Sequence, residues 1–100
     1  MFVEIDANGR VSLRDADNFA AFKVLTLTTD CELIDRAIQS IGHCEGNFAW
    51  ISRDWLLTTI KGDDALWREK LDSMIEYAMK KGWFNPGRNS IRAHIEVPEI

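Results

Sequence analysis

The heptapeptide IRAHIEV, residues 91–97, is the clearest structural signal in the chain, because its side chains alternate strictly between apolar and polar. The two sides are Ile91, Ala93, Ile95 and Val97 against Arg92, His94 and Glu96. A period of two is typical of a strand with one face on a core. Pro98 ends the strand, since proline has no N–H for a ladder hydrogen bond. NPGR (85–88), just before it, is a turn.

A hairpin is predicted at the other end of the chain, in VEIDANGRVSL (3–13). A three-residue loop over 7–9, with Gly9 in the left-handed position of a bulge, pairs apolar residues with each other: Ile5 with Val11 and Val3 with Leu13. A two-residue loop would place Ile5 opposite Ser12 instead. We therefore expect the three-residue loop.

Two further strands are expected, FKVLTLT (22–28) and NFAWI (47–51). The first carries three β-branched residues, which fit a pleated sheet. Its competing interpretation is a single helix over 15–27, which the same β-branched residues disfavour. Asp15 and Asp17 are possible caps of a short helical turn ahead of this strand.

A helix is predicted over 30–41, where apolar residues recur at helical spacing: Ile34, Ala37, Ile38 and Ile41. Thr29 and Glu32 have the spacing of a capping box, and Gly42 ends the helix. The segment GHCEG (42–46) is then a helix exit and a turn that leads into the next strand.

Two more helices follow. One has Ser52 as its N-cap and closes at Gly62. The longest begins at Asp63 or Asp64 and ends at Gly82, and its apolar positions recur at helical spacing: Trp67, Leu71, Met74, Ile75 and Ala78.

These elements predict a small single-domain α+β protein over residues 1–100. Its sheet is expected to be largely antiparallel, with about five strands that start with an N-terminal β-hairpin. About three helices are expected to pack on one face of this sheet, which leaves the polar side of the 91–97 strand uncovered.

The net charge of −4 and the pI near 5.1 argue against a nucleic-acid partner, which requires a basic face. No apolar run approaches the length of a membrane span, and the first residues do not have the pattern of a signal peptide. A cytoplasmic location is therefore expected.

Cys31 and Cys44 are expected to be free thiols. Cys31 lies in the first turn of the 30–41 helix and Cys44 lies just beyond its end, so a helix between them separates the two by about 18 Å. A disulfide requires Cα atoms within about 7 Å. Two unpaired thiols also fit a reducing cytoplasm.

We expect neither a metal site nor a catalytic site. His43, Cys44 and His94 are possible metal ligands, but they lack the near-neighbour spacing that zinc sites use. Cys31 at a helix N-terminus has no recognisable base partner. The phosphate-binding and nucleophile-elbow motifs are also absent from the sequence. No cofactor is expected.

Arg92, His94 and Glu96 are the candidate site, because they project from one side of one strand at about 6.6 Å intervals. A solvated face with cross-strand charge pairs is the simplest interpretation. In a ligand pocket, Arg92 would clamp an anion, His94 would carry a proton and Glu96 would orient it. Trp50, one of four tryptophans, is the aromatic residue assigned to this pocket.

The sequence favours a non-enzymatic module that self-associates, as a homodimer, or binds another protein. Its support is the absence of catalytic motifs and the abundance of large aromatic residues. The alternative is a small-molecule or enzymatic pocket at Arg92, His94 and Glu96, and we lean against an enzyme.

Overall fold

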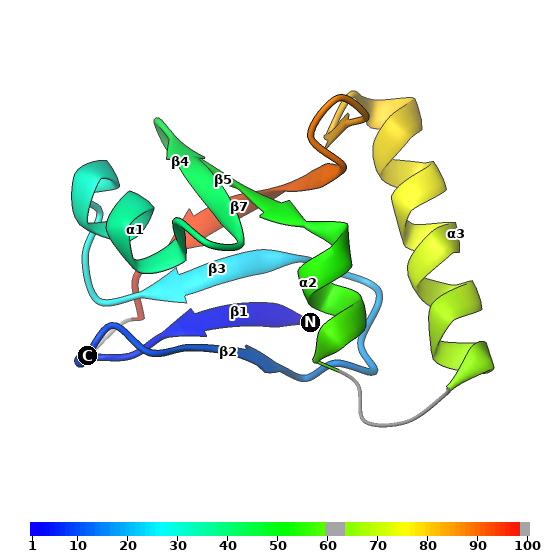
Figure 1. Cartoon of the computed structure of the whole chain (residues 1–100), viewed down its shortest axis with the longest axis horizontal. Helices are drawn as coiled ribbons and strands as arrows, with labels where there is room; N and C mark the ends of the chain where they lie inside the picture. The colour runs from blue at the N-terminus through cyan, green and yellow to red at the C-terminus, as the bar shows by residue number, and fades with distance from the viewer. Residues whose placement is uncertain (60–63, 99–100) are drawn as a thin grey trace.

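The structure, a computed structural model, describes residues 1–59 and 64–98. In this part of the chain, Figure 1 shows a curled sheet with three helices against it. The strands are β1 (Phe2–Ile5), β2 (Val11–Arg14), β3 (Lys23–Thr26), β4 (Gly42–Glu45), β5 (Phe48–Ser52), β6 (Phe84–Asn85) and β7 (Ser90–Glu96). The helices are α1 (Cys31–Ile38), α2 (Arg53–Thr58) and α3 (Ala65–Lys81).

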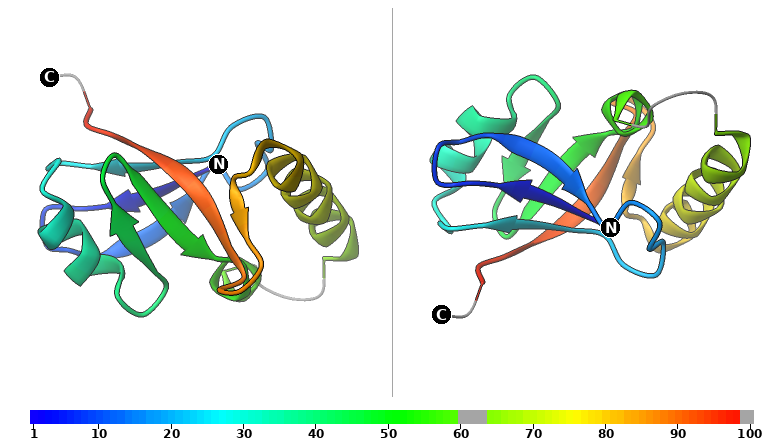
Figure 2. Two further views of the ribbon diagram at one scale, coloured as in Figure 1. Left: turned by 90° about the horizontal axis from the view of Figure 1, so that it is seen from above. Right: turned by 90° about the horizontal axis from the view of Figure 1, so that it is seen from below.

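The sheet is mixed, with strand order β2-β1-β3-β7-β5-β4 and with β6 paired to β7 outside this path. Strand β3 is parallel to both β1 and β7, and the other pairs are antiparallel. Strand β7 therefore joins the two halves of the sheet, and Figure 2 shows α1 and α3 at opposite ends of it. The predicted α+β class is confirmed, and β4 and β6 are additional to the five strands expected.

The N-terminal hairpin has the predicted register. Val3 lies opposite Leu13 and Ile5 lies opposite Val11. The Asp6 N–H donates to the Arg10 carbonyl at 3.0 Å, which closes the three-residue loop. Gly9 has φ of +78°, the left-handed conformation that glycine adopts without steric cost.

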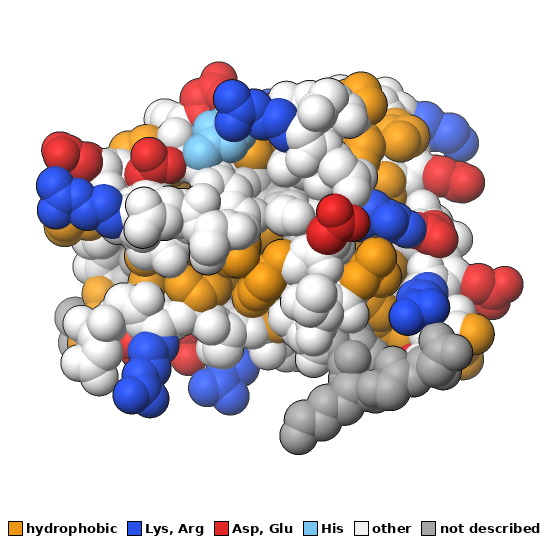
Figure 3. Space-filling model, in the orientation of Figure 1, with side chains coloured by type: hydrophobic (Ala, Val, Ile, Leu, Met, Phe, Trp, Pro, Cys, Tyr) orange, Lys and Arg blue, Asp and Glu red, His pale blue; other side chains and the backbone are white. Residues whose placement is uncertain are grey.

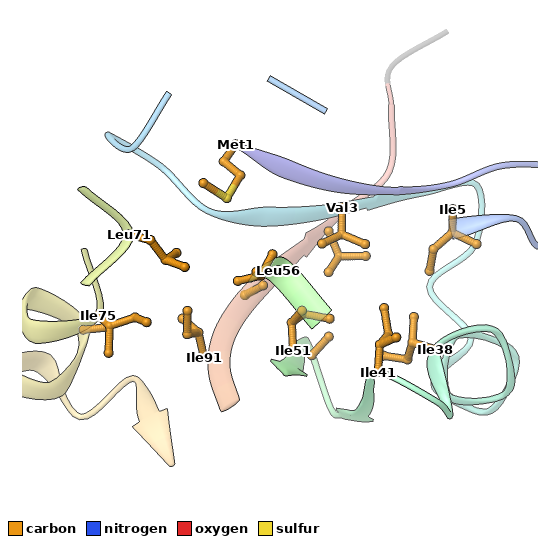
Figure 4. Packing of buried hydrophobic residues seen from close by; sticks show 14 of the residues in the cluster. Met1, Val3, Ile5, Ile38, Ile41, Ile51, Leu56, Leu71, Ile75 and Ile91 are labelled. Atoms are coloured by element: carbon orange, nitrogen blue, oxygen red, sulfur yellow. The ribbon is translucent and has the colours of Figure 1, made fainter. Parts of the chain in front are cut away.

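One hydrophobic core lies between the sheet and the helices. Figure 4 shows side chains from β1, β5 and β7 directed toward those of α1, α2 and α3, for example Val3, Ile51, Ile91, Ile38, Leu56, Leu71 and Ile75. The apolar side of β7 follows the predicted alternation as far as Ile95, which is half-buried. Val97 lies beyond the strand and is 43% exposed.

The ends of α2 and α3 are confirmed where they are described. The Ser52 hydroxyl accepts from the Trp55 N–H at 3.3 Å, and the Asp64 carboxylate accepts from the Trp67 N–H at 3.0 Å. Gly82 ends α3 with φ of +77°. The expected end of α2 at Gly62 and the alternative start of α3 at Asp63 lie outside the described residues.

The predicted end of the first helix was wrong. Helix α1 ends at Ile38, and residues 42–45 form the edge strand β4 instead of a helix exit and turn. A side chain at Gly42 would overlap the Trp50 carbonyl group, so glycine is needed there for close approach to β5. The predicted cap was also displaced by one residue, since Asp30 accepts from the Glu32 N–H.

The prediction that Cys31 and Cys44 cannot pair was also wrong, because they form a disulfide. Strand β4 turns back along α1 rather than continuing away from it, and this reversal brings the two Cα atoms to 5.6 Å. The Asp35 carboxylate also accepts a hydrogen bond from the Cys44 N–H at 2.9 Å. Helix α1 is therefore fastened to the edge of the sheet.

The segment after β2 is a turn and not the expected short helix. The Asn18 N–H donates to the Asp15 carbonyl at 3.0 Å, and Asp15 has φ of +51°, which is incompatible with a right-handed helix. Strand β3 confirms the strand predicted within 22–28, and the competing helix over 15–27 does not form.

Figure 3 shows the surface of the molecule in the orientation of Figure 1. Charged side chains of both signs lie around the rim of this surface, and apolar side chains form a broken band across its middle.

Candidate interaction face on the sheet

The polar side of β7 lies on the outer face of the sheet, which we define as the side opposite the core. Strand pairing extends this row of side chains over six strands, because directly opposed residues share a face. The paired residues are Arg14–Phe2–Lys23–His94–Phe48–Glu45 in one row and Arg92–Trp50–His43 in the next.

Arg92 is held between two aromatic rings. Its guanidinium carbon lies 4.2 Å from the centre of the Phe48 ring and 5.7 Å from that of Trp83. A cation above an aromatic face is attracted by the ring quadrupole, and a guanidinium group also stacks well because it is planar. Arg92 therefore links β5, β7 and the chain segment before β6.

Trp50 extends this arrangement toward the sheet edge. Its ring lies 6.4 Å from that of His43 on β4, and the two planes are only 14° apart. The Trp50 indole N–H donates to the Glu45 carboxylate at 3.2 Å. The indole is thus fixed by one stacking partner and one hydrogen bond, while the side chain stays partly exposed.

His94 and Glu96 are engaged in cross-strand contacts. His94 is exposed and makes an edge contact with Phe48, with ring centres 6.1 Å apart. Glu96 forms an ion pair with Lys23 at 3.0 Å, and both side chains are more than one-third exposed. Exposed pairs of this kind contribute about 0–1 kcal/mol, so they organise the face more than they stabilise the fold.

The structure brings Arg92 and Trp50 together as neighbours across β5 and β7 but does not join all four predicted residues in one hollow. Arg92 lines a hollow of about 110 Å³ with Trp83, Tyr77 and Phe22. Neither His94 nor Glu96 lines this hollow or the three other hollows that lie elsewhere on the described chain. Ligand binding at the four residues stays a prediction.

The possible metal ligands are not assembled. Cys44 is bonded to Cys31, which removes it as a thiolate ligand. His43 stacks on Trp50, whereas His94 contacts Phe48. Within residues 1–59 and 64–98, no group of three or more candidate ligands could hold a metal ion.

Phe48, Trp83, His43 and Lys23 belong to this face but were not predicted as site residues. The strand NFAWI did contain a signal, because it alternates large aromatic residues with Ala49 and Ile51. The large residues, Phe48 and Trp50, therefore share the side opposite the core. The contribution of Trp83 has no comparable signal, since it lies outside the regular strands.

These features define a small α+β domain with an open sheet face that carries aromatic side chains and charges of both signs. No family model, curated protein or solved structure matches the chain. Among the described helices, none is both long enough and apolar enough to cross a bilayer.

Proposed function

We propose that the domain is a non-enzymatic interaction module that self-associates through the outer face of its sheet. The observation that carries this proposal is the arrangement of Arg92 between Phe48 and Trp83, continued by Trp50. Tryptophan and arginine are the residue types that dominate binding energy at protein interfaces. Side chains that are already ordered by their neighbours also lose less entropy on association.

A second copy of the chain is favoured by the charge of this face. Its fixed charges balance, with Arg14, Lys23 and Arg92 against Glu4, Glu45 and Glu96. The chain as a whole has a net charge of −4, so the excess negative charge lies elsewhere. Two copies related by a two-fold axis can therefore meet at this face without a net repulsion between like charges.

The test is sedimentation equilibrium from micromolar to millimolar concentration. The chain should form dimers, and the Trp50→Ala variant should raise the dimer dissociation constant by about thirtyfold, the effect of losing a side chain worth about 2 kcal/mol. Met79→Ala is the matched control, because Met79 is 53% exposed but lies on α3. A chain that stays monomeric throughout, or equal effects of the two variants, would contradict the proposal.

A small-molecule site remains a second candidate because of the hollow beside Arg92. Its volume of about 110 Å³ is below the roughly 300–1,000 Å³ typical of ligand pockets, which favours a small anion or a single ring as the ligand. Titration with benzoate, followed by the indole NMR signals, distinguishes the cases. Saturable shifts at Trp83 without shifts at Trp67 would support this site, and unshifted signals would reject it.

The proposal includes a cytoplasmic location, although the argument from free thiols no longer supports it. Disulfides persist mainly in oxidising compartments, whereas the location was inferred partly from free thiols. Alkylation of thiols in intact cells before lysis tests it. Cys31 and Cys44 that are alkylated without prior reduction would support a reducing compartment, and complete protection would contradict it.

A further inference from the structure

A second surface lies between helix α3 and the turn that follows β2. The two segments enclose an open, elongated hollow of about 1,090 Å³. It extends along α3 from Leu66 to Tyr77, a rise of about 16 Å, or three helical turns. We call this hollow the α3 groove.

The floor of the α3 groove is apolar and partly uncovered. Phe19 and Met74 are half-buried against the core. Leu66 and Tyr77 are 61% and 56% exposed, although both are large and apolar over most of their surface. Residues 66, 73 and 77 lie on one stripe of α3, so the uncovered positions follow a single line along the helix.

The opposite wall of the groove is held in place. The Trp67 indole N–H donates to the Ala16 carbonyl at 2.8 Å, and the rings of Trp67 and Phe19 are 5.8 Å apart. The Met1 ammonium group donates to the carbonyl groups of Asn18 and Ala21. The groove is therefore formed before any partner arrives, which reduces the entropy lost on binding.

The rim of the groove is acidic. Asp17, Glu69, Asp72 and Glu76 line it, against Lys70 as its basic residue. Asp72 is paired with Arg53 at 2.8 Å. No ion pair of the described chain involves Asp17, Glu69 or Glu76. An apolar floor with unpaired carboxylates along its rim favours an occupant that is apolar on one side and basic on its flanks.

We propose that the α3 groove binds a segment of another protein whose apolar side chains are flanked by lysine or arginine, such as an amphipathic helix of about three turns. The charge pattern excludes a second copy of the same groove, because a two-fold contact would bring Glu69 and Glu76 against their own counterparts. The proposal is independent of self-association through the sheet face, since no residue that lines the groove belongs to that face. Trp83 and Arg92 line the smaller hollow beside the groove.

The test uses two amidated peptides of matched pattern, KLLKLLKKLLK and ELLELLEELLE, and measures binding by calorimetry. The lysine peptide should bind and the glutamate peptide should not, with affinity that falls as salt is added. Glu69→Gln and Glu76→Gln should each weaken binding about two- to fivefold, the range for exposed charge pairs. Glu32→Gln on α1 removes the same charge from a distant exposed site and should leave binding unchanged.

The apolar floor is tested by Leu66→Ala, which should weaken the lysine peptide at least about tenfold if Leu66 is an anchor. Leu33→Ala is the control, because Leu33 is 50% exposed on α1. Equal binding of both peptides would overturn the proposal. So would an effect of Glu32→Gln as large as those of Glu69→Gln and Glu76→Gln, or no effect of Leu66→Ala. Loss of self-association in Leu66→Ala would instead assign the groove to a second copy. Circular dichroism verifies that each variant is folded.

Discussion

Gly42 lies where strand β4 passes close to β5, and the space beside its Cα is occupied by backbone. A Cβ placed there would overlap the Trp50 carbonyl group and approach the Ile51 Cα to 3.2 Å. The backbone of β5 is paired with β7 on its other side, so it cannot move aside as the end of a flexible side chain can. The need for glycine is therefore imposed by the neighbouring strand and not by the dihedral angles of Gly42 itself.

Gly42→Ala should destabilise the chain by at least roughly 2 kcal/mol, since overpacking against a fixed wall forces strand displacement. Urea unfolding measures the change. Gly87→Ala is the matched control, because its Cβ would meet only the end of the Asn85 side chain, at 3.3 Å. An effect of Gly42→Ala no larger than that of the control would contradict the close approach.

Titration of the Met1 α-amino group should make the free energy of unfolding depend on pH. Burial lowers the pKa of this group below its ordinary value of 8.0, while the charge of Asp15 acts in the opposite direction and Lys23 lowers it further. The unfolded chain therefore binds this proton more tightly than the folded chain. The free energy of unfolding should rise as pH increases through the lowered pKa and level off above the ordinary value.

Thermal unfolding between pH 6 and pH 9, roughly the range in which α-amino groups titrate, measures this rise. A chain acetylated at Met1 cannot titrate there and should lack this component of the slope. Identical slopes for the two forms would show that the Met1 ammonium group is as well solvated in the folded chain as in the unfolded chain.

At the scale of elements, α1 depends on its attachments. An eight-residue helix is too short to persist alone in water, because few hydrogen bonds offset the cost of its first turn. Ile34 and Ile38 anchor it in the core, and the disulfide and Asp35 fasten it to β4. These attachments also cover one edge of the sheet, which would otherwise present unpaired backbone groups.

Reduction of the Cys31–Cys44 disulfide should lower the free energy of unfolding by about 3 kcal/mol, as expected for a closed loop of this length. Hydrogen exchange should then accelerate in α1 and β4 before the rest of the sheet. The double variant Cys31→Ser/Cys44→Ser should have the stability of the reduced chain and should not respond to reductant. Unchanged stability after verified reduction would contradict a supporting role for this bond.

The sequence predicted the elements that have a long periodic pattern. It contained little information about the contacts between those elements. Three features were predictable because local patterns determine them. They are the apolar side of β7, the register of the hairpin, and the ends of α3 at Asp64 and Gly82. The Cys31–Cys44 bond was not, because the distance estimate assumed a helix up to residue 41. The reversal at 39–41 depends on packing against β5, which no local pattern records.

The candidate site shows the same division. Arg92, His94 and Glu96 were predictable as one row because alternation fixes the side of a strand. The sequence could not indicate that Phe48 lies opposite His94, since that requires the register between β5 and β7. It also could not indicate the groove between α3 and the turn after β2. The width of that groove is set by the spacing of two segments that are far apart in the sequence.

At the scale of the whole molecule, the sheet face and the α3 groove are separate surfaces that meet at one place. Trp83 and Arg92 line the small hollow between them, together with Tyr77 and Met74 of α3. Trp83 also contacts the Tyr77 ring, with centres 6.1 Å apart. A partner in the groove and a second copy on the sheet face would therefore both lie near Trp83.

Substitutions should separate the two activities. Trp50→Ala should weaken self-association and leave peptide affinity unchanged, Leu66→Ala should do the reverse, and Trp83→Ala should weaken both. Sedimentation measures self-association and calorimetry measures peptide affinity for the same three variants. The free-energy effects of substitutions at residues that lie far apart should add. Equal sensitivity of both measurements to Trp50→Ala would show that the two surfaces are a single interface.

The central place of β7 also determines when the molecule can fold. Strands β1, β2 and β3 form one group and β4 and β5 another, and the ladder that connects them runs through β7 at residues 90–96. On a ribosome, which releases the chain from its N-terminus, the two groups must wait for a strand that follows both of them in the chain. Until β7 has emerged, the edges at β3 and β5 are exposed to pairing with a wrong neighbour, so aggregation would begin in this interval.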